Sequence, residues 1–103
     1  MDASLINKID DIYTSYNIYK AIFITNIEKI NSLFHQLNEK DYPICTKEKV
    51  QQFNANQYRI LLLDLPSYNE IKTIIDNTNV TTIINIGVFD QIDNIPNVNQ
   101  IFL

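Results

Sequence analysis

The chain has 103 residues, a length typical of a single domain, because two separate cores of half that size would bury too little apolar surface to be stable. Apolar residues make up 46% of the sequence and only one glycine and three prolines occur, so there is ample material for a packed core. The formal net charge of −4 argues against a protein that binds nucleic acid chiefly by neutralising phosphates, because such proteins carry a basic surface.

The single cysteine, Cys45, excludes an intramolecular disulfide and the usual cysteine-paired zinc sites, which fits a reducing compartment. The first residues, MDASLINKIDD, lack the basic and apolar regions of a signal peptide, and no apolar run reaches the length of a membrane span. We therefore expect a cytoplasmic protein without membrane contact. The abundance of Ile and Asn, with one Arg against seven Lys, indicates A/T-rich codons and a source such as a virus, a plasmid or a parasite.

The first third of the chain predicts a helix, a strand and a second helix. Residues 4–18 have the spacing of an amphipathic helix with Ser4 as its N-cap, carried by Leu5, Ile9, Ile12, Tyr13, Tyr16 and Tyr19. The run AIFIT at 21–25 is apolar on both faces, as in a buried strand. The sequence TNIE at 25–28 has the capping-box pattern, so we expect the hydroxyl of Thr25 to cap the second helix. The buried stripe of that helix would be Ile27, Ile30, Leu33, Phe34 and Leu37.

The rest of the chain is expected to continue this alternation. Pro43 marks an extended piece over 41–45 near a sheet edge, and Thr46 can cap a short helix that runs through Phe53. YRILLLD at 58–64 is the clearest strand, a capping-box pattern at 67–70 predicts a short helix, and 80–86 and 98–103 predict two more strands. Because parallel strands need crossovers, we predict an α/β fold: a three-layer, mostly parallel sheet with helices on both faces and strands 21–25, 58–64 and 81–86 at its centre.

The order and residues of these elements resemble the second RecA-like domain of superfamily-2 helicases, the DEAD-box and Snf2-type motors included, with residues 1–103 as one such domain. KAIFIT at 20–25 looks like the motif IV strand, whose family pattern is k-a-I-I-F-x-x-T. YPI at 42–44 is similar to the end of L-x-x-x-L-x-x-x-g-y-x-v, and QFNANQYRILLL at 52–63 to F-x-x-g-x-x-r-v-L-l-x-T. IIDNTNVTTIIN at 74–85 looks like r-G-i-D-i-p-x-v-t-x-V-I-n. The resemblance implies a RecA-like, Rossmann-like sheet.

The departures from that family bear on catalysis. Of the Arg-Gly-x-Asp signature in motif V, the chain keeps only Asp76, and no arginine follows Arg59, whereas the family's motif VI arginines stabilise charge in the transition state. The single glycine, Gly87, cannot form a glycine-rich phosphate-binding loop. We therefore expect a degenerate lobe with no ATP hydrolysis, no catalytic residues, no cofactor and no metal.

Other residues with reactive side chains are interpreted as structural. His35 has no partner at a suggestive spacing and is expected at the surface or its boundary, and Cys45 is expected to be an unreactive, partly buried thiol. The carboxylate pairs Asp10 with Asp11 and Asp90 with Asp93 are expected to be solvated, because a cation site needs several converging oxygen ligands.

Tyr13, Tyr16 and Tyr19 are the candidate partner-binding residues. Aromatic rings at helical spacing usually pack on a sheet, but Leu5, Ile9, Ile12 and Tyr16 already suffice to bury one helix face. Tyr13 and Tyr19 are then surplus and are expected to be exposed, where tyrosine is favoured in interfaces. Arg59 would in family terms lie near the backbone of a bound nucleic acid, with a solvated arginine at a strand end as the alternative.

The sequence thus favours a non-catalytic, helicase-derived protein-binding module. Its partner would be a helicase, a transcription or translation component, or a second copy of the chain. One alternative is an accessory factor that contacts nucleic acid through the strand-end loops, against which the acidic charge counts. Another is a small flavodoxin-like ligand-binding domain, disfavoured because no glycine-rich turn follows residues 21–25.

Overall fold

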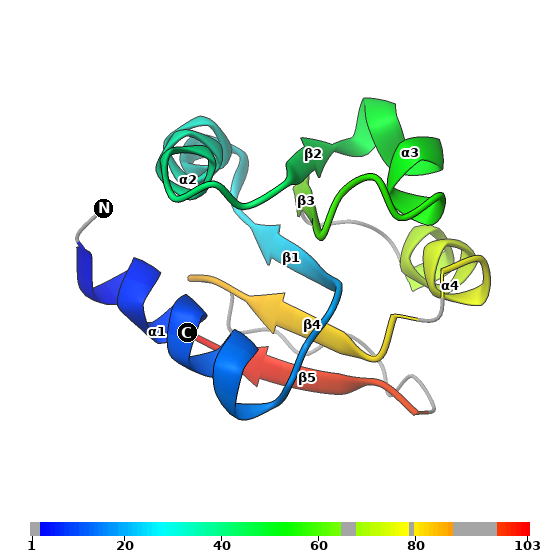
Figure 1. Cartoon of the computed structure of the whole chain (residues 1–103). Helices are drawn as coiled ribbons and strands as arrows, with labels where there is room; N and C mark the ends of the chain where they lie inside the picture. Colours follow the sequence, from blue (N-terminus) through cyan, green and yellow to red (C-terminus); the bar gives the residue numbers. More distant parts are fainter. Residues whose placement is uncertain (1–2, 65–67, 79, 88–96) are drawn as a thin grey trace.

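Five parallel strands form one sheet in the order β2-β3-β1-β4-β5 in the computed structural model, which describes residues 3–64, 68–78, 80–87 and 97–103 (Figure 1). The strands are β1 (Ala21–Thr25), β2 (Ile44–Thr46), β3 (Ile60–Asp64), β4 (Thr82–Asn85) and β5 (Asn99–Phe102). The helices are α1 (Ala3–Ser15), α2 (Ile27–Glu39), α3 (Val50–Asn54), which follows a 3-10 turn η1 (Lys47–Lys49), and α4 (Tyr68–Asp76). The predicted α/β class, the parallel sheet and its three central strands are confirmed.

Two apolar clusters fill the space on the two faces of the sheet. Side chains alternate across a strand, so Phe23 packs with α1 and α2, whereas its neighbour Ile22 packs with α3 and α4. Every residue of β1 is buried, because a central parallel strand is covered on both faces. The absence of charged side chains from β1 suits this position. The strand 41–45 predicted near an edge is β2, which ends the sheet on one side.

Helix α1 ends three residues before the predicted position, at Ser15, because the chain turns at Asn17. Asn17 has a φ of 52°, and the N–H of Ile18 donates to the carbonyl of Tyr13 at 3.1 Å, the pattern that closes many helices. Asp41 (φ 63°) follows α2 and Asn56 (φ 66°) follows α3 in the same conformation. Asn and Asp tolerate this left-handed region better than other residues with a Cβ, so they take the place of the usual glycine.

The start of α2 differs from the sequence prediction. The hydroxyl of Thr25 donates to the carbonyl of Ile86 at 2.9 Å, so it joins β1 to the end of β4 and does not cap the helix. Asn26 takes the N-cap position without a side-chain cap hydrogen bond. Leu33 and Leu37 are buried as predicted, but Ile27, the first residue of α2, is 69% exposed and does not belong to the buried stripe. The predicted cap at Ser67 lies outside the described residues.

None of the helices in the described ranges is long and apolar enough to cross a membrane.

Candidate functional site

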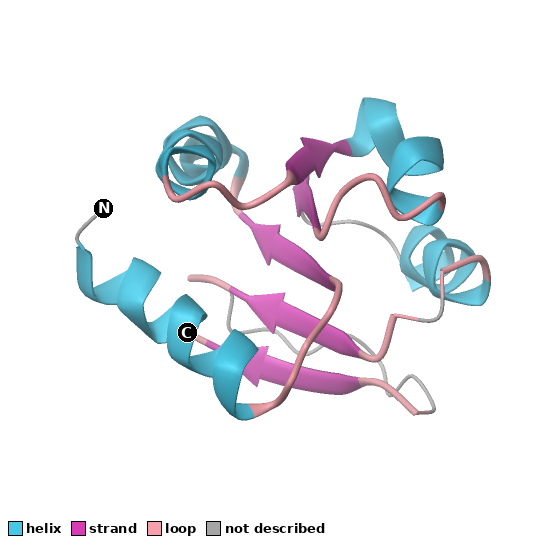
Figure 2. Cartoon of the chain, viewed as in Figure 1, coloured by secondary structure: helices cyan, strands magenta, loops and turns pink. Residues whose placement is uncertain are grey.

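The largest hollow for which the lining is described lies at the amino ends of the strands. It has a volume of about 790 Å³. We call it the amino-edge pocket; its lining is Tyr16, Asn17, Ile18, Tyr19, Lys20, Asn56, Thr78, Thr81, Thr82, Asn99, Gln100 and Ile101. In Figure 2, the loop that follows α1 runs to the tail of the β1 arrow, and further loop segments precede β3, β4 and β5. The pocket therefore forms because parallel strands bring the residues before β1, β3 and β4 and the first residues of β4 and β5 to one edge.

Two of the three candidate tyrosines line this pocket and the third does not. Tyr16 is 67% exposed and Tyr19 is 59% exposed, which is unusual for side chains of this size. Tyr13 is only 7% exposed, so the expectation that it is exposed and that Tyr16 is buried is wrong. The buried stripe of α1 is Ile6, Ile9 and Tyr13, at spacings of three and four, and Tyr16 lies past the last helical residue.

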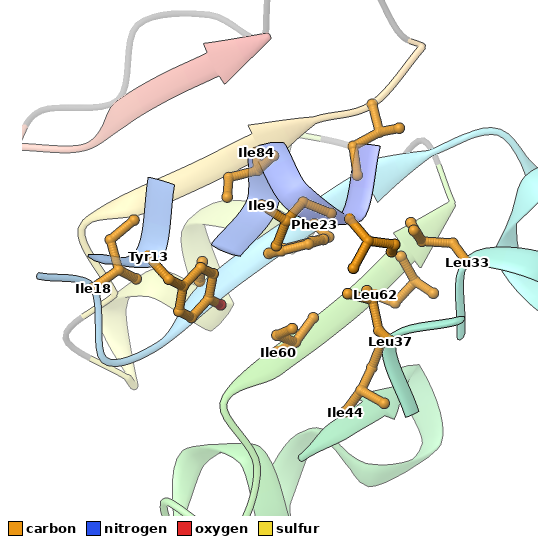
Figure 3. Packing of buried hydrophobic residues seen from close by; sticks show 13 residues of the cluster. Ile9, Tyr13, Ile18, Phe23, Leu33, Leu37, Ile44, Ile60, Leu62 and Ile84 are labelled. Atoms are coloured by element: carbon orange, nitrogen blue, oxygen red, sulfur yellow. The ribbon is translucent and has the colours of Figure 1, made fainter. Parts of the chain in front are cut away.

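Tyr13 is part of the core beneath the pocket. Its ring lies 6.2 Å from that of Phe23 and meets the ring of Tyr42 edge-on at 5.5 Å, and Figure 3 shows it between Ile18 and Ile60. Its hydroxyl donates to the carbonyl of Arg59 at 3.3 Å, and burial raises its pKa, so the hydroxyl remains a proton donor. Without local opening of α1, Tyr13 offers a partner no surface.

Arg59 fastens the pocket-forming loop to the sheet. Its Nε donates to the carbonyl of Tyr19 at 2.8 Å and its Nη2 donates to the carbonyl of Ile18 at 3.0 Å. The guanidinium carbon lies 5.4 Å from the ring centroid of Tyr13 and 5.5 Å from that of Tyr19. Two charge-assisted hydrogen bonds to the carbonyls of residues 18 and 19 and the contact with the Tyr19 ring attach this loop to the start of β3. The side chain is thus engaged within the fold at the position where the nucleic-acid hypothesis placed a contact.

Lys20 is the only charged residue among the described residues that line the pocket. Its ammonium donates to the carbonyl of Phe53 at 3.1 Å and lies 4.8 Å from the centroid of the Phe53 ring. It therefore holds the end of α3 against the start of β1, and burial lowers its pKa. The remaining lining side chains are hydroxyls, amides, two exposed rings and two isoleucines, a set suited to hydrogen bonding and aromatic contact.

The remaining candidate residues lie elsewhere. His35 is exposed on α2, and Cys45 is 2% exposed in β2, where burial raises its pKa to about 11, as expected for an unreactive thiol. Asp10 accepts a hydrogen bond from the hydroxyl of Tyr42, which ties α1 to the start of β2. Asp90 and Asp93 lie outside the described residues, and within those residues no group of three or more His, Cys, Asp or Glu side chains could hold a metal ion.

The amino-edge residues were only partly foreseen. The sequence predicts Tyr16 and Tyr19 but not Asn56, Thr82 and Asn99. Asn56 precedes the predicted strand 58–64, where a polar residue is a usable signal, whereas Thr82 and Asn99 lie inside the predicted strands 80–86 and 98–103. No family model, curated protein or solved structure matches the chain. A parallel sheet between two helical layers supports many unrelated functions, so the likeness to the helicase lobe rests on sequence patterns alone.

Proposed function

We propose that this protein is a non-catalytic protein-binding module that docks a partner protein in the amino-edge pocket, with Tyr16 and Tyr19 as the main contacts. The observation that carries the proposal is the exposure of these two rings, 67% and 59%, on the rim of the largest described hollow. Tyrosine is enriched in binding hot spots because it is large, rigid and half polar. The helicase resemblance adds the expected class of partner: a helicase, or a transcription or translation component.

The composition of the pocket supports a protein partner. Tyrosine with small amides and hydroxyls is the combination that antibody binding loops use, because the rings supply area and the small groups adapt their hydrogen bonds. Asn17, Asn56 and Asn99 supply the amides, and Thr81 supplies an exposed hydroxyl. Peptide backbone and amide side chains are the natural partners of such groups.

The order of the pocket-forming loop also supports binding. Because Arg59 already fixes residues 18–19 through two backbone carbonyls, Tyr19 loses little conformational freedom when a partner binds. A phosphate backbone is a poorer fit, since the formal charge of the chain is −4 and the ammonium of Lys20 is engaged with Phe53.

The first experiment identifies and measures the partner. The tagged protein carrying a photo-crosslinking phenylalanine analogue at position 16 or 19 is irradiated in its native cell, and the crosslinked protein is purified for calorimetry. We expect Tyr16→Ala and Tyr19→Ala each to weaken its binding by at least about fivefold, the loss that defines an energetically important contact. His35→Ala is the control, because His35 is exposed on α2 and does not line the amino-edge pocket. Affinities within twofold of the parent for both tyrosine variants would overturn the proposal.

A second measurement tests the non-catalytic part. The purified chain should hydrolyse ATP no faster than a matched blank. Turnover that copurifies with the chain and falls in Asp76→Asn or Arg59→Met would contradict a purely binding role.

A further inference from the structure

A second hollow region lies at the carboxyl ends of β2 and β3, opposite to the amino-edge pocket. It consists of two adjoining hollows of about 460 Å³ and about 370 Å³, which share Lys47, Leu63 and Glu70. We call it the carboxyl-edge groove; its lining is Ile27, Ile30, Asn31, Thr46, Lys47, Glu48, Val50, Leu62, Leu63, Asp64, Asn69, Glu70, Thr73 and Ile74. The ion pair of Lys47 and Glu70, at 3.3 Å, lies where the two hollows adjoin.

The chain topology accounts for the position of the groove. β1 and β3 are neighbours, but β1 continues into α2 on one face of the sheet and β3 leads to α4 on the other. Chains that leave neighbouring parallel strands toward opposite faces leave a crevice at the carboxyl ends, and α/β proteins bind ligands in such crevices. The larger hollow lies at this point, between α2 and the end of β3.

The inner surface of the groove is apolar. Leu63 lines both hollows, Ile27 and Ile30 line one, and Val50 and Ile74 line the other. Ile27 is 69% exposed, although a helix residue beside a core is normally covered. An apolar side chain from a partner would remove this surface from water, which favours association.

The rim of the groove is acidic. Among the described lining residues, Glu48, Asp64 and Glu70 carry three negative charges against the one positive charge of Lys47. Glu48 accepts a hydrogen bond from the hydroxyl of Thr46, which lowers the pKa of Glu48 and keeps its carboxylate charged. Glu48 and Asp64 are both exposed and can accept from a cation that lies across the groove.

We propose that the carboxyl-edge groove docks an amphipathic polypeptide segment that carries lysine or arginine beside apolar side chains. Its apolar side chains enter the two hollows on either side of the Lys47–Glu70 pair, and its basic side chains pair with Glu48 and Asp64. The acidic rim repels nucleic acid and anionic lipid, which leaves a basic peptide as the complementary occupant. This site is separate from the amino-edge pocket, and the two proposals stand or fall independently.

The test uses the full chain and two synthetic helical peptides of equal length, one of leucine and lysine and one of leucine and glutamate. Titration is followed by amide chemical shifts and by calorimetry. We expect the lysine peptide to bind and to shift the amides of Ile27, Lys47, Asp64 and Ile74 most, and the glutamate peptide not to bind. Shifts spread evenly over the surface, or binding of both peptides, would overturn the proposal.

Matched variants separate a specific groove from general attraction to an acidic protein. The double variant Glu48→Gln with Asp64→Asn should lower the affinity for the lysine peptide at least about fivefold, because two charge pairs are lost. Glu39→Gln with Asp11→Asn removes the same two charge types from exposed positions away from the groove and should leave affinity within twofold. Ile27→Ser should weaken binding about threefold or more through the lost apolar contact. An equal loss in the control pair, or none in the groove variants, would contradict the assignment, and Tyr16→Ala with Tyr19→Ala should leave peptide binding intact.

Discussion

The two edges of the same parallel sheet carry different chemistry. At the amino edge the described lining is polar with one ammonium, and at the carboxyl edge it is apolar with an acidic rim. The difference follows from helix direction, because α2, η1 and α4 all begin at the carboxyl ends of strands and carry Glu28, Glu48 and Glu70 in their first turns. At the first turns of α2 and α4, Glu28 and Glu70 interact favourably with the positive end of the helix dipole. The other edge holds the helix ends that are followed by Asn and the polar residues that precede strands. The parallel topology therefore gives the two edges of the sheet different charges.

The largest effect is expected in the core that both edges share. Leu33→Ala removes a fully buried side chain between α2 and the sheet, so the free energy of unfolding should fall by about 2–5 kcal/mol. Urea unfolding followed by circular dichroism measures this, with Asn38→Ala on the exposed face of α2 as the control. A change below about 1 kcal/mol would place Leu33 in solvent. If folded Leu33→Ala binds the lysine peptide with a different affinity, the shape of the carboxyl-edge groove depends on the packing of α2 on the sheet.

The next effect separates the two edges. Arg59→Met keeps the length of the side chain but removes both hydrogen bonds to residues 18–19, which should lower the free energy of unfolding by about 1.5–3 kcal/mol. Partner binding at the amino-edge pocket should weaken because Tyr19 is no longer held, whereas the lysine peptide should bind the carboxyl-edge groove as before. Arg59→Lys should give a free energy of unfolding between those of the parent and Arg59→Met, since an ammonium cannot reproduce the planar arrangement of guanidinium donors. Equal losses of affinity at the amino-edge pocket and the carboxyl-edge groove would contradict a local role of Arg59.

Alkaline pH tests groups that lie at neither pocket. Burial raises the pKa of Cys45 from 9.0 to about 11 and, together with the hydrogen bond to Asp10, that of Tyr42 from 10.0 to about 12. The unfolded chain loses these protons first, so the stability they provide is fully present below pH 9 and is lost as pH rises toward about 11 and 12. At one pH unit above the ordinary Cys value, Cys45 alone should lower the free energy of unfolding by about 1 kcal/mol. Unfolding of Cys45→Ala across this range should show a later onset; an identical pH profile would contradict the assignment.

The smallest effect is expected at Ile27. Its side chain is largely solvated, so Ile27→Ala should change the free energy of unfolding by less than about 0.5 kcal/mol. Thermal unfolding with Ile30→Ala as the comparison measures this, because Ile30 packs against the core. A large loss at Ile27 would show that the first turn of α2 is covered in the folded chain.

The strands were predictable from sequence and the two pockets were not. AIFIT and ILLLD are apolar runs too short for a helix, and burial on both faces leaves no other arrangement for them. The amino-edge pocket draws on residues 16–20, 56, 78, 81, 82 and 99–101, which meet only once the strand order is known. Nothing in local spacing specifies that β1 lies between β3 and β4.

The two errors at helix ends have different causes. The sequence predicts a buried Tyr16 and an exposed Tyr13, the reverse of the structure, because the helical periodicity continues past Ser15. The helix ends at Asn17, which takes the left-handed conformation that glycine usually provides. Thr25 matched a capping pattern, but its hydroxyl instead bonds the carbonyl of Ile86, a residue 61 positions away. A tertiary hydrogen bond of this kind overrides a local motif and is invisible in the sequence.

The left-handed Asn and Asp residues that follow the helices also have a consequence for the unfolded ensemble. Glycine in a turn is easily accommodated when folded but leaves the denatured chain with more conformations to lose. Asn17, Asp41 and Asn56 carry side chains that restrict the denatured chain, which offsets part of the strain of a positive φ. The chain has a single glycine, so the turns that end its helices gain part of their stability from the lower conformational entropy of the unfolded chain. No contact in the native fold shows this contribution.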